Sequence, residues 1–281
     1  MTKRQQVPET LPGAFPARPA SGLPTGDLLD TETVTVDLPT PRVALAVGAH
    51  PDDIEFGAGA TLARWAAAGC HVHHLVLTDG SKGSWDPDAD LGYLVTARKQ
   101  ECRDAASVLY GEWGGIDGRV RFLDIVDGEL VNDVGTRREV CRAIREVRPD
   151  VLLGHDPWRR YRLHPDHRAA GFLTLDALVA ARDPHFAPEL GIEPHRPTAV
   201  LLWEADLPNH VERSSGSASA KVDALLCHNS QLESTMGVGG GDGGRASARE
   251  ALTSRIAWQF AQHGAVASIN AGEAFHLIDD L

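Results

Sequence analysis

The chain has 281 residues, of which 42% are hydrophobic and 23% are charged, close to ordinary globular values. This length and composition exclude a disordered chain and a disulfide-stapled miniprotein, and they are sufficient for a large hydrophobic core. No stretch approaches the roughly 20 apolar residues of a membrane helix, so we expect no membrane span. A formal net charge of -12 opposes binding to polyanions, so we expect no nucleic-acid partner.

The first 40 residues differ in composition from the rest. Six prolines stand there among Thr, Gly and Asp, and neither a helical nor a strand period repeats. We therefore expect an extended, proline-rich N-terminal arm over residues 1–40 and a single α/β domain over residues 41–281. The N-terminus lacks the apolar region of a secretory signal, which predicts a cytoplasmic protein.

From residue 42 onward, apolar strand patterns alternate with helical patterns. Strands are predicted at 43–49, 71–79, 119–125, 151–154 and 198–205, and helices at 57–69, 94–109, 136–147, 165–182, 217–229 and 245–263. Apolar runs between amphipathic helices are typical of parallel strands that are covered on both faces. The sequence therefore predicts an α/β fold of Rossmann-like type, an open and mostly parallel sheet with helices on both faces.

Six glycines lie within residues 236–245. A segment of this composition is too flexible to hold one conformation unaided. Both a plain surface loop and a mobile flap over a site agree with it. We expect a glycine-rich loop there, and its role stays open.

Two His-Pro-Asp motifs follow predicted strands. The motif HPDD at 50–53 comes directly after the first strand, and the motif HPDH at 164–167 follows the strand at 151–154. Proline disfavours a helical conformation at the residue before it and suits the first turn of a helix, so each motif is typical of a strand-to-helix turn. Ligands of open α/β sheets bind beyond the carboxyl ends of the strands. We therefore expect the two turns to meet at one crevice.

Histidine and carboxylate side chains are the ligands that a catalytic metal ion requires. Residues three apart lie on one side of a helical turn, which pairs His50 with Asp53 and His164 with His167. A hydrolytic metal ion is typically held by three protein ligands, which leaves one coordination position for water. The remaining ionisable group of the motifs is then available for proton transfer. Asp52 diverges from Asp53 and is the candidate base for metal-activated water. Such turns also occur as plain helix caps, but two of them with complementary ligand types favour a metal site.

Three segments resemble the PIG-L/LmbE-type metal-dependent deacetylases, which remove acyl groups from N-acetylglucosamine-like amines. The segments are AHPDDIEFGAGATLARWAAAG, ARKQECRDAASVLYG and HPDHRAAG, and the resemblance covers about residues 42 to 232. It implies a metal ion held by His50, Asp53 and His167, with Asp52 as the general base. The expected metal is zinc, and Fe²⁺ or another divalent ion stays open because these ligands suit several ions.

The resemblance also implies roles for three further residues. His164 is expected to stabilise or protonate the tetrahedral intermediate, Asp166 to orient a histidine, and Arg98 to contact the substrate. The implied protein is a metal-dependent N-deacetylase, a hydrolase of linear amide bonds acting on a small aminosugar-type molecule. The family's tyrosine near the second motif has no clean match, although Tyr161 lies close to it.

Three other functions agree with part of this sequence pattern. An amidase of the same family that acts on a thiol-sugar conjugate stays open. An Fe(II) oxygenase with Asp52 as a ligand is disfavoured, because such enzymes are usually built on β barrels. A non-catalytic nucleotide-binding domain is disfavoured by the missing G-x-G-x-x-G spacing. A homo-oligomer stays open.

Overall fold

The computed structural model describes residues 34–111, 119–214, 216–238 and 244–281. These residues belong to one compact unit that runs from Val34 to Leu281. Residues 1–33, most of the predicted N-terminal arm, lie outside the described residues, as do residues 239–243 of the predicted glycine-rich loop. The last residues of the predicted arm are described, and part of them pairs with the sheet.

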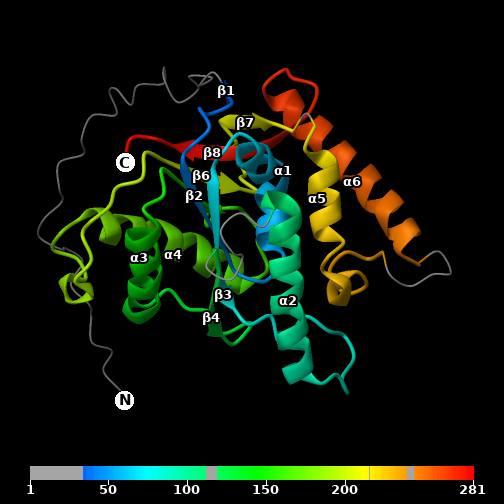
Figure 1. The fold of residues 1–281 in the computed structure, drawn as a ribbon, viewed down its shortest axis with the longest axis horizontal. Coiled ribbons are helices and arrows are strands. Elements are labelled where there is room, and N and C mark those ends of the chain that lie inside the picture. The colour runs from blue at the N-terminus through cyan, green and yellow to red at the C-terminus, as the bar shows by residue number, and fades with distance from the viewer. Residues whose placement is uncertain (1–33, 112–118, 215, 239–243) are drawn as a thin grey trace, which may run out of the picture. The chain divides into compact units, whose positions relative to one another are not determined.

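An eight-stranded open sheet forms the middle layer of this unit (Figure 1). The strand order is β1-β7-β8-β6-β5-β2-β3-β4, and every neighbouring pair is parallel except the two pairs that contain β8. This arrangement confirms the predicted open, mostly parallel sheet. The strands are β1 (Thr35–Val36), β2 (Val43–Gly48), β3 (His71–Thr78), β4 (Val120–Ile125), β5 (Val151–His155), β6 (Ala199–Trp203), β7 (His210–Arg213) and β8 (Gly272–Ile278).

Helices cover both faces of the sheet, as predicted (Figure 1). Alternate residues of β2 show the two sides: Ala44 and Ala46 pack with α1 and α2, whereas Leu45 and Val47 pack with α3 and α4. Helix α5 packs against α1, and α6 packs against α5, in a further apolar cluster. The helices are α1 (Asp53–Ala67), α2 (Leu91–Tyr110), α3 (Val134–Val147), α4 (Pro165–Arg182), α5 (Ala218–Leu225) and α6 (Gly244–Val266), with short 3-10 turns η2 (Pro188–Leu190) and η3 (Asn229–Gln231).

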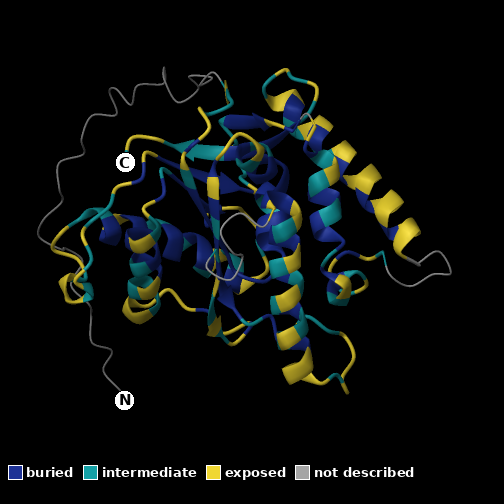
Figure 2. Ribbon diagram, in the orientation of Figure 1, coloured by how far each residue is buried: buried dark blue, intermediate teal, exposed yellow. Residues whose placement is uncertain are grey.

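Burial follows these layers. The strands and the inner faces of the helices are buried, whereas the outward face of α6 is exposed (Figure 2). No helix in the described part of the chain combines the length and apolar character that crossing a membrane requires. The helices bury one face each against the sheet or a neighbouring helix.

The strand order reverses at β2. The chain adds β3 and β4 on one side of β2, and β5 then pairs with its other side. The carboxyl ends of β2 and β5 therefore lie side by side at a topological switch point, where open α/β sheets bind ligands. The HPDD turn follows β2 and the HPDH turn follows β5, so the topology brings both motifs to one crevice.

A buried ion pair contacts the backbone of α1. Lys221 Nζ donates to the carbonyl oxygen of Phe56 at 2.7 Å, and Glu273 Oε1 accepts from the amide of Ala60 at 3.2 Å. These two backbone groups are i, i-4 partners in a regular α-helix. Because Lys221 Nζ also lies 2.6 Å from Glu273 Oε1, one ion pair satisfies both backbone groups in the turn that follows Asp53.

We expect Lys221→Met to lower the free energy of unfolding by about 3–5 kcal/mol, because it leaves the Glu273 carboxylate buried without its cation. Urea unfolding followed by circular dichroism measures this loss. The matched control is Arg249→Met on α6, whose ion pair with Asp223 is exposed and is expected to contribute about 0–1 kcal/mol. Equal losses in the two variants would show that the buried pair adds no special stability.

Candidate active site

The HPDD turn holds two buried carboxylates at the end of β2. Asp53 Oδ2 accepts a hydrogen bond from the backbone amide of His50 at 2.7 Å, which closes the turn. Asp52 has a φ of 140°, a conformation that residues other than glycine rarely adopt. Strained backbone of this kind is concentrated at functional sites. Helix α1 starts at Asp53, four residues before the predicted start, so the turn leads directly into the helix.

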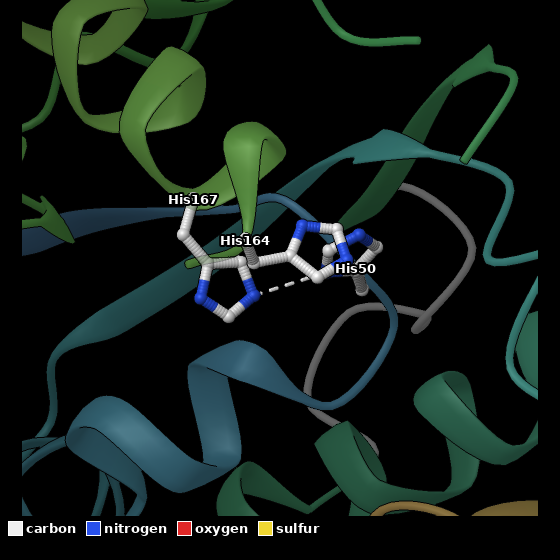
Figure 3. A group of neighbouring side chains, drawn as sticks. All are labelled: His50, His164 and His167. Carbon is white, nitrogen blue, oxygen red and sulfur yellow. Dashed lines mark hydrogen bonds between the residues drawn. The ribbon is translucent and has the colours of Figure 1, made fainter. Parts of the chain in front are cut away.

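The three predicted metal ligands converge in the structure. His50 Nδ1 lies 3.2 Å from His167 Nε2, and Asp53 places Oδ2 3.3 Å from His50 Nδ1 and Oδ1 3.3 Å from His167 Nε2. Tetrahedral zinc with bonds of about 2.0–2.1 Å places its ligand atoms about 3.3 Å apart. The two histidine nitrogens lie at about this separation, and each lies at it from one of the two oxygens of Asp53. Figure 3 shows His50 reaching the rings of His164 and His167 from the opposite side.

His155, the last residue of β5, contacts Asp53 from behind. Its Nδ1 accepts from Trp203 Nε1 at 3.0 Å, which assigns the proton of the neutral ring to Nε2, 3.1 Å from Asp53 Oδ2. Both ring nitrogens of His155 thus have partners, and the ring lies where it can orient the Asp53 carboxylate. His155 was not predicted from the sequence, because it is a single residue at the end of an apolar strand and has no motif spacing to identify it.

Two aspartates face the other ring nitrogen of His50. His50 Nε2 lies 3.1 Å from Asp127 Oδ1 and 3.3 Å from Asp166 Oδ2. Asp166 is fully buried and also accepts from the backbone amides of Gly128 at 2.6 Å and Leu130 at 3.3 Å. Asp166 therefore stands where an orienting carboxylate is expected. Asp127 was missed, although its position just after β4 places it at the same edge of the sheet.

Opposite charges in this centre shift pKa values in opposite directions. Burial favours neutral His50, but hydrogen bonds to Asp127, Asp166 and Asp53 outweigh it and raise the pKa of His50 well above 6.5. Burial also favours protonated Asp53, but His167 and His155 hold the pKa of Asp53 well below 3.8. A cation bound here competes with the proton on His50, so we expect metal binding to release protons.

Arg98 packs behind Asp52. Its Nη2 lies 3.3 Å from Asp52 Oδ2 and donates to the carbonyl oxygen of Pro51 at 3.0 Å, while Nη1 donates to the carbonyl oxygen of Gly80 at 2.8 Å. A Cβ atom on Gly80 or Gly83 would come within 2.7 Å or 2.3 Å of Arg98 Nη1. These glycines therefore make room for the guanidinium. Arg98 also lines the cavity described below, and its predicted contact with substrate stays a prediction.

His164 is the N-cap of α4 and is exposed to the cavity. Its Nδ1 accepts from the backbone amide of Asp166 at 3.3 Å, which assigns the proton of the neutral ring to Nε2. Burial, followed by the nearby His50 and His167, lowers the pKa of His164 below 6.5. At neutral pH the ring therefore offers an N–H donor rather than a full positive charge.

The arginines before the HPDH motif are paired within the protein. Arg162 Nη1 lies 2.8 Å from His167 Nδ1, and its Nη2 lies 2.6 Å from Glu204 Oε2. The neighbouring Arg159 and Arg160 pair with Glu204 and Asp206. Tyr161 is 93% exposed and is not among the residues that line the cavity described next.

A cavity of about 600 Å³ opens over these residues, within the range of small-molecule sites. Its walls combine aromatic faces with amide, hydroxyl and cationic groups, a mixture that suits a polar molecule with apolar faces. Besides the residues described above, the cavity is lined by Phe56, Gly57, Lys82, Gly83, Trp85, Gly128, Pro165, Gln231, Ser234, Thr235, Arg255 and Gln259.

The HPDD and HPDH turns carry histidine and aspartate side chains and meet at the switch point of an open sheet, next to a cavity of small-molecule size. This arrangement is typical of α/β enzymes. The chain belongs to the PIG-L family. Residues 45–178 match the family model described as PIG-L, GlcNAc-PI de-N-acetylase. This membership confirms the resemblance and the predicted enzyme class, an N-deacetylase.

Individual relatives agree with this assignment. A diacetylchitobiose deacetylase of Thermococcus kodakarensis is 35% identical over 194 residues, which cover 68% of this chain and 70% of that protein. A 1D-myo-inositol 2-acetamido-2-deoxy-alpha-D-glucopyranoside deacetylase of Streptomyces avermitilis is 35% identical over 179 residues, covering 55% of this chain and 58% of that protein. The structure of N,N'-diacetylchitobiose deacetylase from Pyrococcus horikoshii has the same fold, with a TM-score of 0.73, 24% identity, and coverage of 85% and 84% of the two chains.

Proposed function

We propose that this protein is a zinc-dependent hydrolase that removes an N-acetyl group from an aminosugar-containing small molecule or conjugate. The observation that carries the proposal is the convergence of His50, Asp53 and His167 at separations of 3.2–3.3 Å, with Asp52 on the cavity wall beside them. The names of the relatives support the substrate class, since two of them act on N-acetylated aminosugars.

A divalent ion bound by these three residues supplies Lewis acidity to a carbonyl oxygen and to a water molecule. Asp52 takes the proton of the attacking water, because its carboxylate lines the cavity next to the ligands. His164 donates a hydrogen bond from Nε2 to the oxyanion that develops on the carbonyl oxygen, and the amine leaves with the proton that Asp52 took from the water. Asp166 and His155 keep His50 and Asp53 oriented.

The pH dependence of the rate tests Asp52 as the base. Burial raises the pKa of Asp52 above 3.8, and the positive charge of Arg98 opposes this shift. A base works only when deprotonated, so activity should fall as the pH drops through this raised pKa. Arg98→Gln removes the opposing charge and should move the acidic limb of kcat/KM to higher pH. Lys82→Met, which removes a cavity charge paired with Glu129, should leave the position of the limb unchanged. An acidic limb that stays in place in Arg98→Gln would argue against Asp52.

A substrate panel tests the reaction itself. Purified protein is incubated with N-acetylglucosamine, diacetylchitobiose and an N-acetylglucosaminyl inositol, and acetate and free amine are measured together. Equal amounts of acetate and amine from at least one compound are the expected result. A panel that yields neither product would contradict the proposal. Cleavage of a thiol-sugar conjugate at its amide, without acetate release from the panel, would favour the amidase alternative instead.

A further inference from the structure

A second group of side chains of metal-ligand type lies between β3, α1 and α2. Glu55, His74 and Cys102 each place one ligand atom within 4.8 Å of the other two, and all three residues are at least 99% buried. None of them belongs to the HPDD or HPDH turn. The cluster is therefore distinct from the site that the sequence motifs predict.

The polar atoms of this cluster lack hydrogen-bond partners among the described residues. They are both carboxylate oxygens of Glu55, Nδ1 of His74 and both ring nitrogens of the neighbouring His228. Glu55 Oε1 lies 3.8 Å from His74 Nδ1, and Oε2 lies 3.5 Å from His228 Nε2. Buried polar groups are nearly always hydrogen-bonded, and unsatisfied ones often mark the place of an ion. Several buried polar atoms without hydrogen-bond partners therefore lie close together in this cluster.

We propose that Glu55, His74 and Cys102 bind a second divalent cation of the zinc type. Carboxylate, imidazole and thiolate are all zinc ligands, and the thiolate selects zinc over magnesium or calcium. The Cys102 thiol loses its proton to solvent as its sulfur binds the cation. The charges of one carboxylate and one thiolate then balance the charge of the divalent ion.

The surroundings of the cluster match those of metal ligands. The hydroxyl of Tyr110 is hydrogen-bonded to His74 Nε2 and can accept a hydrogen bond from Nε2–H, and in this tautomer the lone pair of Nδ1 is free for the cation. His228 Nε2 lies 3.5 Å from Oε2 of Glu55, whereas His74 Nδ1 is paired with the other oxygen, Oε1. Zinc ligands of these types lie about 3.3–3.6 Å apart, so binding draws the three atoms together by roughly 1 Å.

Cobalt substitution tests this site separately from the active site. The protein is stripped of metal, reloaded with Co²⁺, and measured by absorption spectroscopy and elemental analysis. The ligands proposed for the active site are nitrogen and oxygen atoms, so only the second site can give a thiolate-to-cobalt charge-transfer band in the near ultraviolet. We expect this band, together with two cobalt ions per chain.

Variants assign the band to its residue. Cys102→Ser should abolish the charge-transfer band and lower the bound cobalt by one ion per chain. The matched control is Cys141→Ser, a change at a buried cysteine on α3, which should keep the band and both cobalt ions. His167→Gln should lose the active-site ion and keep the band, so failure of the proposed function is distinguishable from failure of this inference. If Cys102→Ser does not fold, His74→Gln serves in its place. Folded wild type without the band, or a band that survives Cys102→Ser, would overturn the proposal.

Discussion

Asp52→Asn is expected to lower kcat for acetate release by about 100-fold to 10,000-fold, the range for loss of a general base, while metal content stays at the wild-type level. The amide cannot take a proton from water, but it has nearly the same shape and can keep its contact with Arg98. Steady-state kinetics with an N-acetylated aminosugar and elemental analysis of the same sample measure the two quantities.

Asp156→Asn is the matched control for this prediction. Asp156 is also a buried aspartate after a strand of the sheet, but it accepts from the amides of Trp158 and Asp206 and does not line the cavity. Its loss should affect kcat far less. If Asp52→Asn instead lost its metal, Asp52 would be a ligand, as the oxygenase alternative requires.

His167→Gln should remove one metal ion per chain and reduce acetate release to background. The imidazole supplies one of the three ligands, and Asp53 loses a partner 3.3 Å from its Oδ1 at the same time. Equilibrium dialysis followed by elemental analysis measures the bound metal. The control is His185→Gln, an exposed histidine after α4, which should bind as much metal as wild type. Wild-type metal content in His167→Gln would refute the ligand assignment.

The sequence predicted the centre of the fold better than its edges. Strands β2, β5 and β6 are almost entirely apolar, because both faces of the sheet are covered there. Strands β1 and β7 have two and four residues, and β8 pairs antiparallel with strands far away in sequence. Pairings of this kind leave no local period, so the apolar pattern could not reveal them.

A similar division holds for the candidate site. The predicted ligands His50, Asp53 and His167 lie in two compact motifs, and the order of the strands brings these motifs together. His155 and Asp127 each come from the end of another strand, and a single residue has no spacing to identify it. Their contribution depends on tertiary contacts that only the structure shows.

The central claim is that a metal ion held by the two motifs is required for amide hydrolysis. The most direct test is acetate release from an N-acetylated aminosugar by protein stripped with a chelator and then titrated with zinc. We predict that the stripped protein is inactive and that zinc restores activity to a plateau in wild type but not in His167→Gln. Full acetate release by the stripped protein would contradict the claim.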